Sequence, residues 1–158
     1  KSTYAKQLKA ENPVICSADN YFIVNGEYKF DKSKLGEAHA SCLRRFVHYL
    51  TADYSPKRDL ILVDNTHITT LEIAPYAQLA LAYGAELEVI TLMVDLETAL
   101  ARNVHGVNRK GIERQYDNLI RAEIPSRWNP KTIMQDKPVV KELEVNSVTG
   151  KVFITSDT

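Results

Sequence analysis

Short apolar runs alternate with segments of helical periodicity along most of the chain, and this alternation limits the folds open to it. Residues 60–63 are four consecutive apolar residues, Leu-Ile-Leu-Val, and a longer apolar run lies within 86–94. Strands that are apolar on both faces are typical of a parallel sheet covered by helices. A shorter run at 14–16 has the same character. The order of these segments predicts an α/β fold with parallel strands joined by right-handed crossovers.

The segments between the apolar runs have the spacing of amphipathic helices. Within 36–52, Leu43, Phe46, Val47 and Leu50 recur at intervals of three and four residues, which places them on one helical face. Further helices are expected at residues 2–8, 76–83, 96–104 and 112–120.

Capping and turn residues mark the ends of several elements. Thr69 and Glu72 have the spacing of a capping box before the helix at 76–83. Pro75 lies late for a first helical turn, so we expect an irregular start to that helix. Gly84 ends the helix, and Asn25-Gly26 predicts a turn within an irregular connection.

The size and charge of the chain exclude several classes of protein. Its 158 residues suffice for one domain. Because 20 basic residues balance 20 acidic ones, a strongly basic nucleic-acid coat is excluded, although a local basic site is not. The apolar runs are too short to cross a membrane. Two cysteines and the lack of a signal-peptide pattern predict a cytoplasmic protein with reduced thiols, and no His/Cys spacing suggests zinc.

We expect a single domain over 1–158. In this division, residues 1–124 form the core and lid, and residues 125–158 form a C-terminal extension. The stretch from 139 to 158 alternates in part and contains Thr149-Gly150, which predicts a β-hairpin.

Acidic residues follow all three predicted strands. Asp19, Asp64 and Asp95 each come at or just after the end of an apolar run. Since parallel sheets bind ligands beyond the carboxyl ends of their strands, these acids are the first candidates for a functional site.

A series of motifs between residue 1 and about residue 120 carries a resemblance to a known family. They are Lys1-Ser2-Thr3, Ser17-Ala18-Asp19-Asn20-Tyr21-Phe22, Phe30-Asp31 followed by Leu35-Gly36-Glu37-Ala38-His39, Val63-Asp64-Asn65-Thr66, Glu72-Ile73-Ala74-Pro75-Tyr76 and Ala101-Arg102-Asn103-Val104-His105-Gly106-Val107. In this order they resemble P-loop kinases of the polynucleotide-kinase type, including the NEDD4-binding-protein subgroup.

The resemblance implies a three-layer P-loop fold. Its first strand and most of its glycine-rich loop would precede Lys1, so that the first strand is absent from 1–158. We expect strands at 13–16, 60–63 and 87–94 to be parallel neighbours, with the place of the first strand in the middle of the sheet. Because the backbone N–H groups of that loop hold the phosphates, a chain starting at Lys1 should bind nucleotide poorly.

The resemblance also implies an ATP- and Mg²⁺-dependent phosphotransferase that acts on the 5'-hydroxyl of a nucleic acid. Asp19 would be the general base, and Arg102, in the lid, would stabilise charge on the transferred phosphoryl group. ATP and its phosphates would be contacted by Lys1, Ser2, Thr3 and Arg109. Mg²⁺ would be bound by the hydroxyl of Ser2 and, indirectly, by Asp64. Asn65 and Thr66 would contact the substrate or the loop after Asp19.

Several alternatives stay open from the sequence. Asp19 could instead cap the turn that follows it, and Thr66 could cap the next helix. The sequence departs from the family at two positions. Asn20 stands in place of a second Asp, and Phe22 stands where the bacteriophage member of the family has an Arg that binds the substrate phosphate. The second departure leaves recognition of the acceptor open. A kinase for a nucleoside or another small alcohol is one alternative. A nucleotide-binding or interaction module without turnover is the other.

Aromatic residues near Asp19 have two possible roles. Tyr21, Phe22, Tyr28 and Phe30 could stack a nucleobase, or they could pack the loop over the core. The sequence favours neither role.

Overall fold

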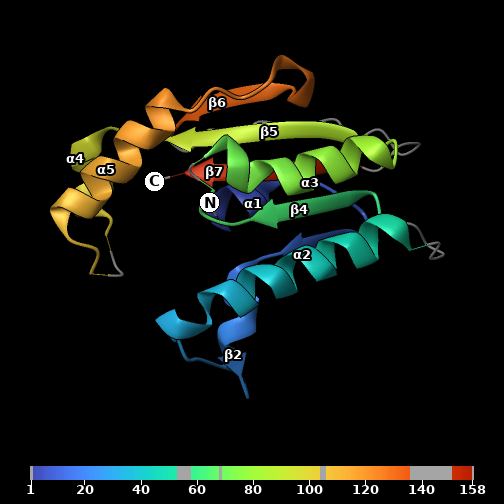
Figure 1. The fold of residues 1–158 in the computed structure, drawn as a ribbon, viewed down its shortest axis with the longest axis horizontal. Coiled ribbons are helices and arrows are strands. Elements are labelled where there is room, and N and C mark those ends of the chain that lie inside the picture. The colour runs from blue at the N-terminus through green and yellow to red at the C-terminus, as the bar shows by residue number, and fades with distance from the viewer. Residues whose placement is uncertain (1, 53–57, 68, 104–105, 136–150, 158) are drawn as a thin grey trace.

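The structure of the chain is a computed structural model that describes residues 2–52, 58–67, 69–103, 106–135 and 151–157 (Figure 1). Its helices and strands are α1 (Ser2–Gln7), β1 (Pro13–Cys16), β2 (Ile23–Val24), β3 (Glu27–Tyr28), α2 (Leu35–Thr51), β4 (Leu60–Asp64), α3 (Thr70–Ala82), β5 (Glu86–Met93), α4 (Leu96–Ala101), α5 (Arg109–Arg121), β6 (Pro130–Met134) and β7 (Lys151–Asp157). Short 3₁₀ turns lie at Ala18–Phe22, Lys32–Lys34 and Ser126–Trp128.

A five-stranded sheet in the order β1-β4-β7-β5-β6 forms the centre of the fold, and every neighbouring pair in it is parallel. The expected α/β fold with a parallel sheet is therefore confirmed. Because the strands are parallel, their carboxyl ends share one edge. In Figure 1 the arrowheads of β4, β5 and β7 point towards α4 and α5, so this edge faces those helices.

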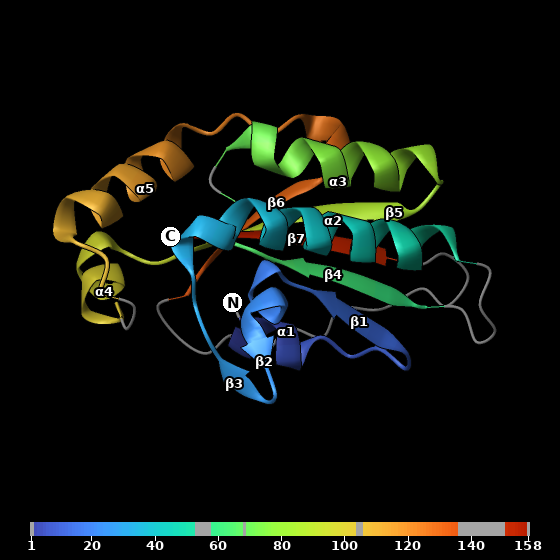
Figure 2. The ribbon, with the colours of Figure 1, turned by 60° about the horizontal axis from the view of Figure 1, so that its bottom comes forward.

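Helices cover both faces of the sheet (Figure 2). Ile61 and Val63 contribute to the larger core cluster, together with residues of α2 and α3. Leu60 and Leu62 contribute to a second cluster with Tyr4 of α1. The alternation along β4 thus explains why residues 60–63 are apolar throughout: each side chain is buried under a helix on its own side. In the part of the chain that the structure describes, no helix is both long and apolar enough to cross a membrane.

The middle of the sheet differs from our expectation. β1 and β4 are parallel neighbours, as expected, but β4 and β5 are not, because β7 lies between them and pairs with both. The position that we assigned to a strand preceding Lys1 is occupied by residues from the other end of the chain. Backbone groups on the inner edges of β4 and β5 need partners when buried, and β7 supplies them.

The expected C-terminal β-hairpin is wrong for the described part of that segment. β7 has a parallel partner on each side, so neither of its edges is available for an antiparallel strand. β6, in the same extension, instead pairs in parallel with β5. The rest of the predicted hairpin, residues 139–150, lies outside the described residues.

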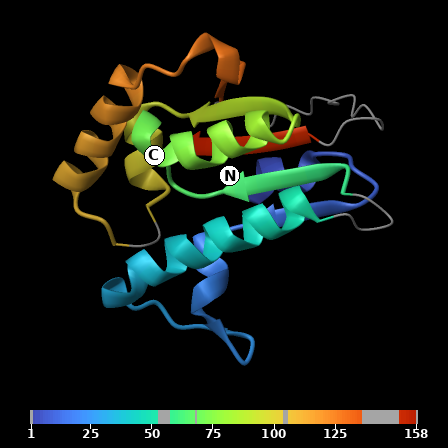
Figure 3. The same cartoon turned by 45° about the vertical axis from the view of Figure 1, so that its right-hand side comes forward.

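A small hairpin is present where we expected an irregular connection. β2 and β3 pair antiparallel around Asn25 and Gly26, whose φ angles are 54° and 81°. Such left-handed angles at both central residues are typical of an Asn-Gly hairpin turn. Figures 1 and 3 show this hairpin projecting from the body of the molecule near the start of α2.

The start of α3 follows the capping pattern in the sequence. The Thr69 hydroxyl accepts a hydrogen bond from the Glu72 backbone N–H, and the Glu72 carboxylate accepts one from the Thr69 N–H, so the capping box is confirmed. The irregular start that we expected from Pro75 is wrong, because the helix is regular from Thr70 and contains Pro75. The capping box satisfies the first-turn donors despite the proline.

Candidate functional site

Asp19 lies in the 3₁₀ turn that follows β1, with an exposed side chain. The Ser17 hydroxyl accepts a hydrogen bond from the Asp19 backbone N–H at 3.3 Å and so caps the turn. The Tyr28 phenol donates to Asp19 Oδ1 at 3.2 Å. Burial, and then the charge of Asp19, raise the pKa of Tyr28, which keeps the phenol protonated as a donor. Oδ2 of Asp19 accepts no hydrogen bond from the described residues and is open to an incoming hydroxyl.

Asn65, just after β4, connects the ends of the two neighbouring strands. Its buried side chain accepts a hydrogen bond from the Ala18 backbone N–H, with 2.7 Å between Oδ1 and N. Its Nδ2 donates to Cys42 Sγ of α2 at 3.3 Å and lies 3.4 Å from Nε2 of His67. The segment that carries Asp19 is therefore held to the end of β4 by an amide whose two ends are both engaged.

Tyr76 and His67 extend this buried polar cluster towards α3. Their rings lie 5.2 Å apart, and the Tyr76 hydroxyl interacts with the side chains of Cys42 and Asn65. Burial, followed by the interaction with Cys42, raises the pKa of Tyr76 well above its usual value. The sequence assigned no role in the site to His67 or Cys42; the available signal was a histidine three residues after Asp64, which ends a buried strand.

Asp64 is the last residue of β4, at the same edge of the sheet as the turn with Asp19. Its Oδ1 is buried and has no hydrogen-bond partner among the described residues. An unsatisfied buried carboxylate oxygen is costly, and a hydrated cation or a hydroxyl donor at this edge would satisfy it. No three His, Cys, Asp or Glu side chains within the described ranges are grouped so that they could hold a metal ion alone. A magnesium ion here would need phosphate oxygens and water as its other ligands.

The remaining predicted residues are dispersed around this edge. Thr66 is exposed directly after Asn65. Arg102 follows the last turn of α4 and is exposed, and its guanidinium has no partner among the described residues. Arg109 is bonded to Glu113 at 2.7 Å and to Glu97 of α4 at 3.3 Å, so in this state it links α4 to α5. Ser2 and Thr3 lie in α1, but their side chains are not among those that the structure describes. Lys1 lies outside the described residues altogether.

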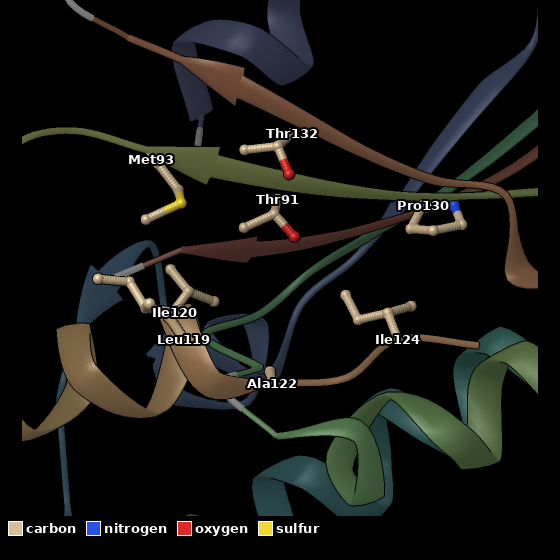
Figure 4. Close-up of a pocket in the computed structure, with 8 residues that line it drawn as sticks. All are labelled: Thr91, Met93, Leu119, Ile120, Ala122, Ile124, Pro130 and Thr132. Atoms are coloured by element: carbon tan, nitrogen blue, oxygen red, sulfur yellow. The ribbon is translucent and has the colours of Figure 1, made fainter. Parts of the chain in front are cut away.

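A cavity of about 460 Å³ lies apart from these residues, between α5 and strands β5 and β6 (Figure 4). Its lining is mostly apolar, with hydroxyls from Thr91 and Thr132. It includes none of the residues predicted to bind or transfer phosphate, and no charged side chain lines it.

Replacing Asn65 with Ala should lower the free energy of unfolding by about 1–3 kcal/mol, because the buried N–H of Ala18 would lose its acceptor. Urea unfolding followed by circular dichroism measures this change. The exposed Asn20→Ala variant serves as the control and should change stability by less than about 0.5 kcal/mol. Equal stability of the two variants would mean that the amide of Asn65 does not hold the Asp19 segment.

Comparisons with known proteins find a relationship in sequence only. The chain is 34% identical over 126 residues to NEDD4-binding protein 2 from Homo sapiens, and the match covers 75% of this chain and 7% of that protein. No family profile matches the chain, and no solved structure matches it. The chain is therefore related to one region of NEDD4-binding protein 2 and spans a small part of its length.

Proposed function

We propose that the chain is an ATP-dependent phosphotransferase domain that acts on the 5'-hydroxyl of a nucleic acid. The observation that carries the proposal is the hydrogen bond from the Ala18 N–H to Asn65 Oδ1, which joins the segment of Asp19 to the strand end of Asp64. Two carboxylates with different surroundings, one exposed and one with a buried oxygen, thus share one edge of a parallel sheet. The ordered motifs that resemble P-loop kinases, and the relationship to a region of NEDD4-binding protein 2, support the same proposal.

Asp19 would act on the acceptor. Its carboxylate would orient the 5'-hydroxyl and take the proton as the O–H bond breaks and the new O–P bond forms, while the bond between the β- and γ-phosphates breaks to release ADP. Tyr28 would keep the carboxylate in place through its hydrogen bond to Oδ1. Arg102, with no described partner to neutralise it, would stabilise the charge on the transferred group.

Asp64 would act on the donor side. Its buried Oδ1 fits a water ligand of magnesium or the hydroxyl of Ser2, and a bound magnesium ion would neutralise phosphate charge. Lys1, Ser2 and Thr3 would contact the phosphates of ATP as the end of a glycine-rich loop. Arg109 would first have to leave Glu97 and Glu113 to bind phosphate.

The position of β7 favours a second candidate, a binding or interaction module without turnover. β7 fills the place between β4 and β5 that the resemblance assigns to the strand before the glycine-rich loop. A chain that keeps β7 there would lack a place for that loop. The two candidates therefore predict different nucleotide affinities.

Transfer of the γ-phosphate of ATP tests the proposal. The protein, in a form that carries a glycine-rich loop ahead of Lys1, is incubated with Mg²⁺, labelled ATP and a panel of single-stranded DNA, RNA, nucleosides and small alcohols. We expect transfer to the oligonucleotides. No transfer to any acceptor would favour the module without turnover, with weak ATP binding as its further sign, and transfer to nucleosides or small alcohols alone would favour a small-molecule kinase.

A further inference from the structure

Four aromatic rings gather beside Asp19. Phe22 is buried, and its ring centroid lies 5.6 Å from that of Tyr21, 6.1 Å from that of Tyr28 and 5.1 Å from that of Phe30. Phe22 therefore fills the packing role that the sequence left open. Tyr28 and Phe30, however, are 51% and 56% exposed, so about half of the surface of each residue is accessible to solvent.

The hairpin adds further apolar surface around these rings. Ile23 and Val24 of β2 are exposed, and Ile23 lies opposite Tyr28 in the antiparallel pair. Val24 follows Ile23 in the strand and so faces the other side of the hairpin. Exposed apolar side chains that lie together on a small domain are typical of a surface that binds something. We call Ile23, Tyr28 and Phe30 the hairpin patch.

The hairpin patch is joined to the candidate base. The Tyr28 phenol donates to Asp19 Oδ1 at 3.2 Å, so the ring of Tyr28 has a fixed position next to the carboxylate. A molecule whose hydroxyl is oriented by Asp19 would have its neighbouring atoms over or beside this ring.

The charged residues around the hairpin patch are of both signs, with Lys29, Lys32 and Lys34 among Asp19, Glu27, Asp31 and Glu37. Lys29 pairs with Glu27 at 3.1 Å, and Lys34 pairs with Glu37 at 2.8 Å. Lys32, in the turn that follows Phe30, makes no ion pair with the described residues and remains available to an anion. Exposed aromatic rings next to an available cation are the combination with which proteins bind single-stranded nucleic acids.

We propose that Tyr28 and Phe30 stack the unpaired 5'-terminal base of the phosphate acceptor and thereby select base-bearing single strands over other alcohols. The inference rests on the proposed function, because it places the acceptor at Asp19. Stacking needs only the flat face of a base, so discrimination among the four bases should be weak.

Equilibrium binding to the full chain tests the inference without turnover. The probes are short single-stranded DNAs with a fluorophore at the 3' end and either a normal or an abasic 5'-terminal residue. We expect Phe30→Ala to weaken binding of the normal probe about tenfold and to leave binding of the abasic probe unchanged. Phe30→Trp, which keeps an aromatic ring at this position, should bind the normal probe as the wild type does.

Tyr83→Ala is the matched control. Tyr83 is also an exposed aromatic residue, 58% accessible, but it ends α3 just before β5 and so lies at the opposite edge of the sheet. This variant should bind both probes as the wild type does. Equal affinity of the wild type for the normal and abasic probes, or of Phe30→Ala and the wild type for the normal probe, would overturn the inference.

The outcomes separate this inference from the proposed function. Phosphate transfer together with base-independent binding would overturn the stacking inference and support the proposed kinase activity. Base-dependent binding could instead be lost in Phe30→Ala while no acceptor is phosphorylated. That outcome would support the stacking inference and overturn the proposed kinase activity. Self-association that Phe30→Ala abolishes, with no binding of either probe, would make the hairpin patch a protein contact and overturn the inference.

Discussion

Replacing Asp19 with Asn is expected to slow phosphate transfer to a 5'-hydroxyl by a factor on the order of 10²–10⁴, because an amide cannot accept the proton of the attacking hydroxyl. The amide keeps the size of the side chain and can still accept the hydrogen bond from Tyr28. ATP affinity should change little, since the proposed function assigns the carboxylate to the acceptor and not to ATP. Initial rates and ATP titrations in the form that carries the glycine-rich loop measure the two effects separately.

Asp31→Asn provides the matched control for that variant. Asp31 is another exposed acid that caps a 3₁₀ turn, through hydrogen bonds from the backbone and hydroxyl of Ser33. Its replacement should leave the transfer rate within about twofold of the wild type, because the Asp31 carboxylate is engaged by Ser33 and no proton transfer is assigned to it. If Asp19→Asn transfers phosphate at the wild-type rate, Asp19 is not the base, and its role is limited to the turn.

Replacing Phe46 with Ala should lower the free energy of unfolding by about 3–5 kcal/mol, which is a large part of the stability of a domain of this size. Phe46 of α2 is fully buried in the larger core cluster. Its ring lies 5.2 Å from that of Tyr76, which belongs to α3. The substitution would leave a cavity between the two helices that cover this face of the sheet. Urea unfolding measures the change.

Leu71→Ala is the control for Phe46→Ala. Leu71 lies in the first turn of α3 and is 82% exposed, so its truncation should change stability by less than about 0.5 kcal/mol. A loss below about 1 kcal/mol for Phe46→Ala would show that α2 and α3 do not pack through this ring as described.

The sequence was most informative where burial dictates the pattern. Residues 60–63 are apolar on both faces because helices cover both faces, and that pattern was sufficient to predict β4 as an inner parallel strand. The 3.6-residue spacing of Phe46 and its neighbours likewise predicted α2. Thr69 and Glu72 predicted the capping box of α3, since a capping box depends on local contacts alone, although the helix was expected only from residue 76.

Long-range pairing was less accessible from the sequence. The central position of β7 depends on which edges β4 and β5 leave open, and no local pattern in 151–157 states which strands will flank it. A two-residue strand is too short to show alternation, so the β2–β3 hairpin was visible only through its Asn25-Gly26 turn. β6 was missed because it is a mostly exposed edge strand and so contains no buried apolar run.

The candidate site shows the same contrast between features that local sequence patterns predict and features that depend on tertiary packing. Strand ends predicted that Asp19 and Asp64 would share an edge, because the carboxyl ends of parallel strands coincide. The resemblance placed Asn65 against substrate or against the loop after Asp19. Its side chain instead accepts a hydrogen bond from the Ala18 N–H, just before Asp19. The bond between Tyr28 and Asp19 joins a hairpin to a turn, and its geometry depends on tertiary packing that spacing does not encode.

The measurement that tests the central claim most directly is whether phosphate from ATP is transferred to an oligonucleotide, and to which of its two ends. The wild type, in the form that carries a glycine-rich loop, is supplied with ATP labelled at the γ-phosphate and a single-stranded oligonucleotide that has hydroxyls at both ends. The account predicts label at the 5' end, and none there when Asp19→Asn is assayed for the same short time. Label at the 3' end, label on the protein alone, or ATP bound with no label transferred would contradict it.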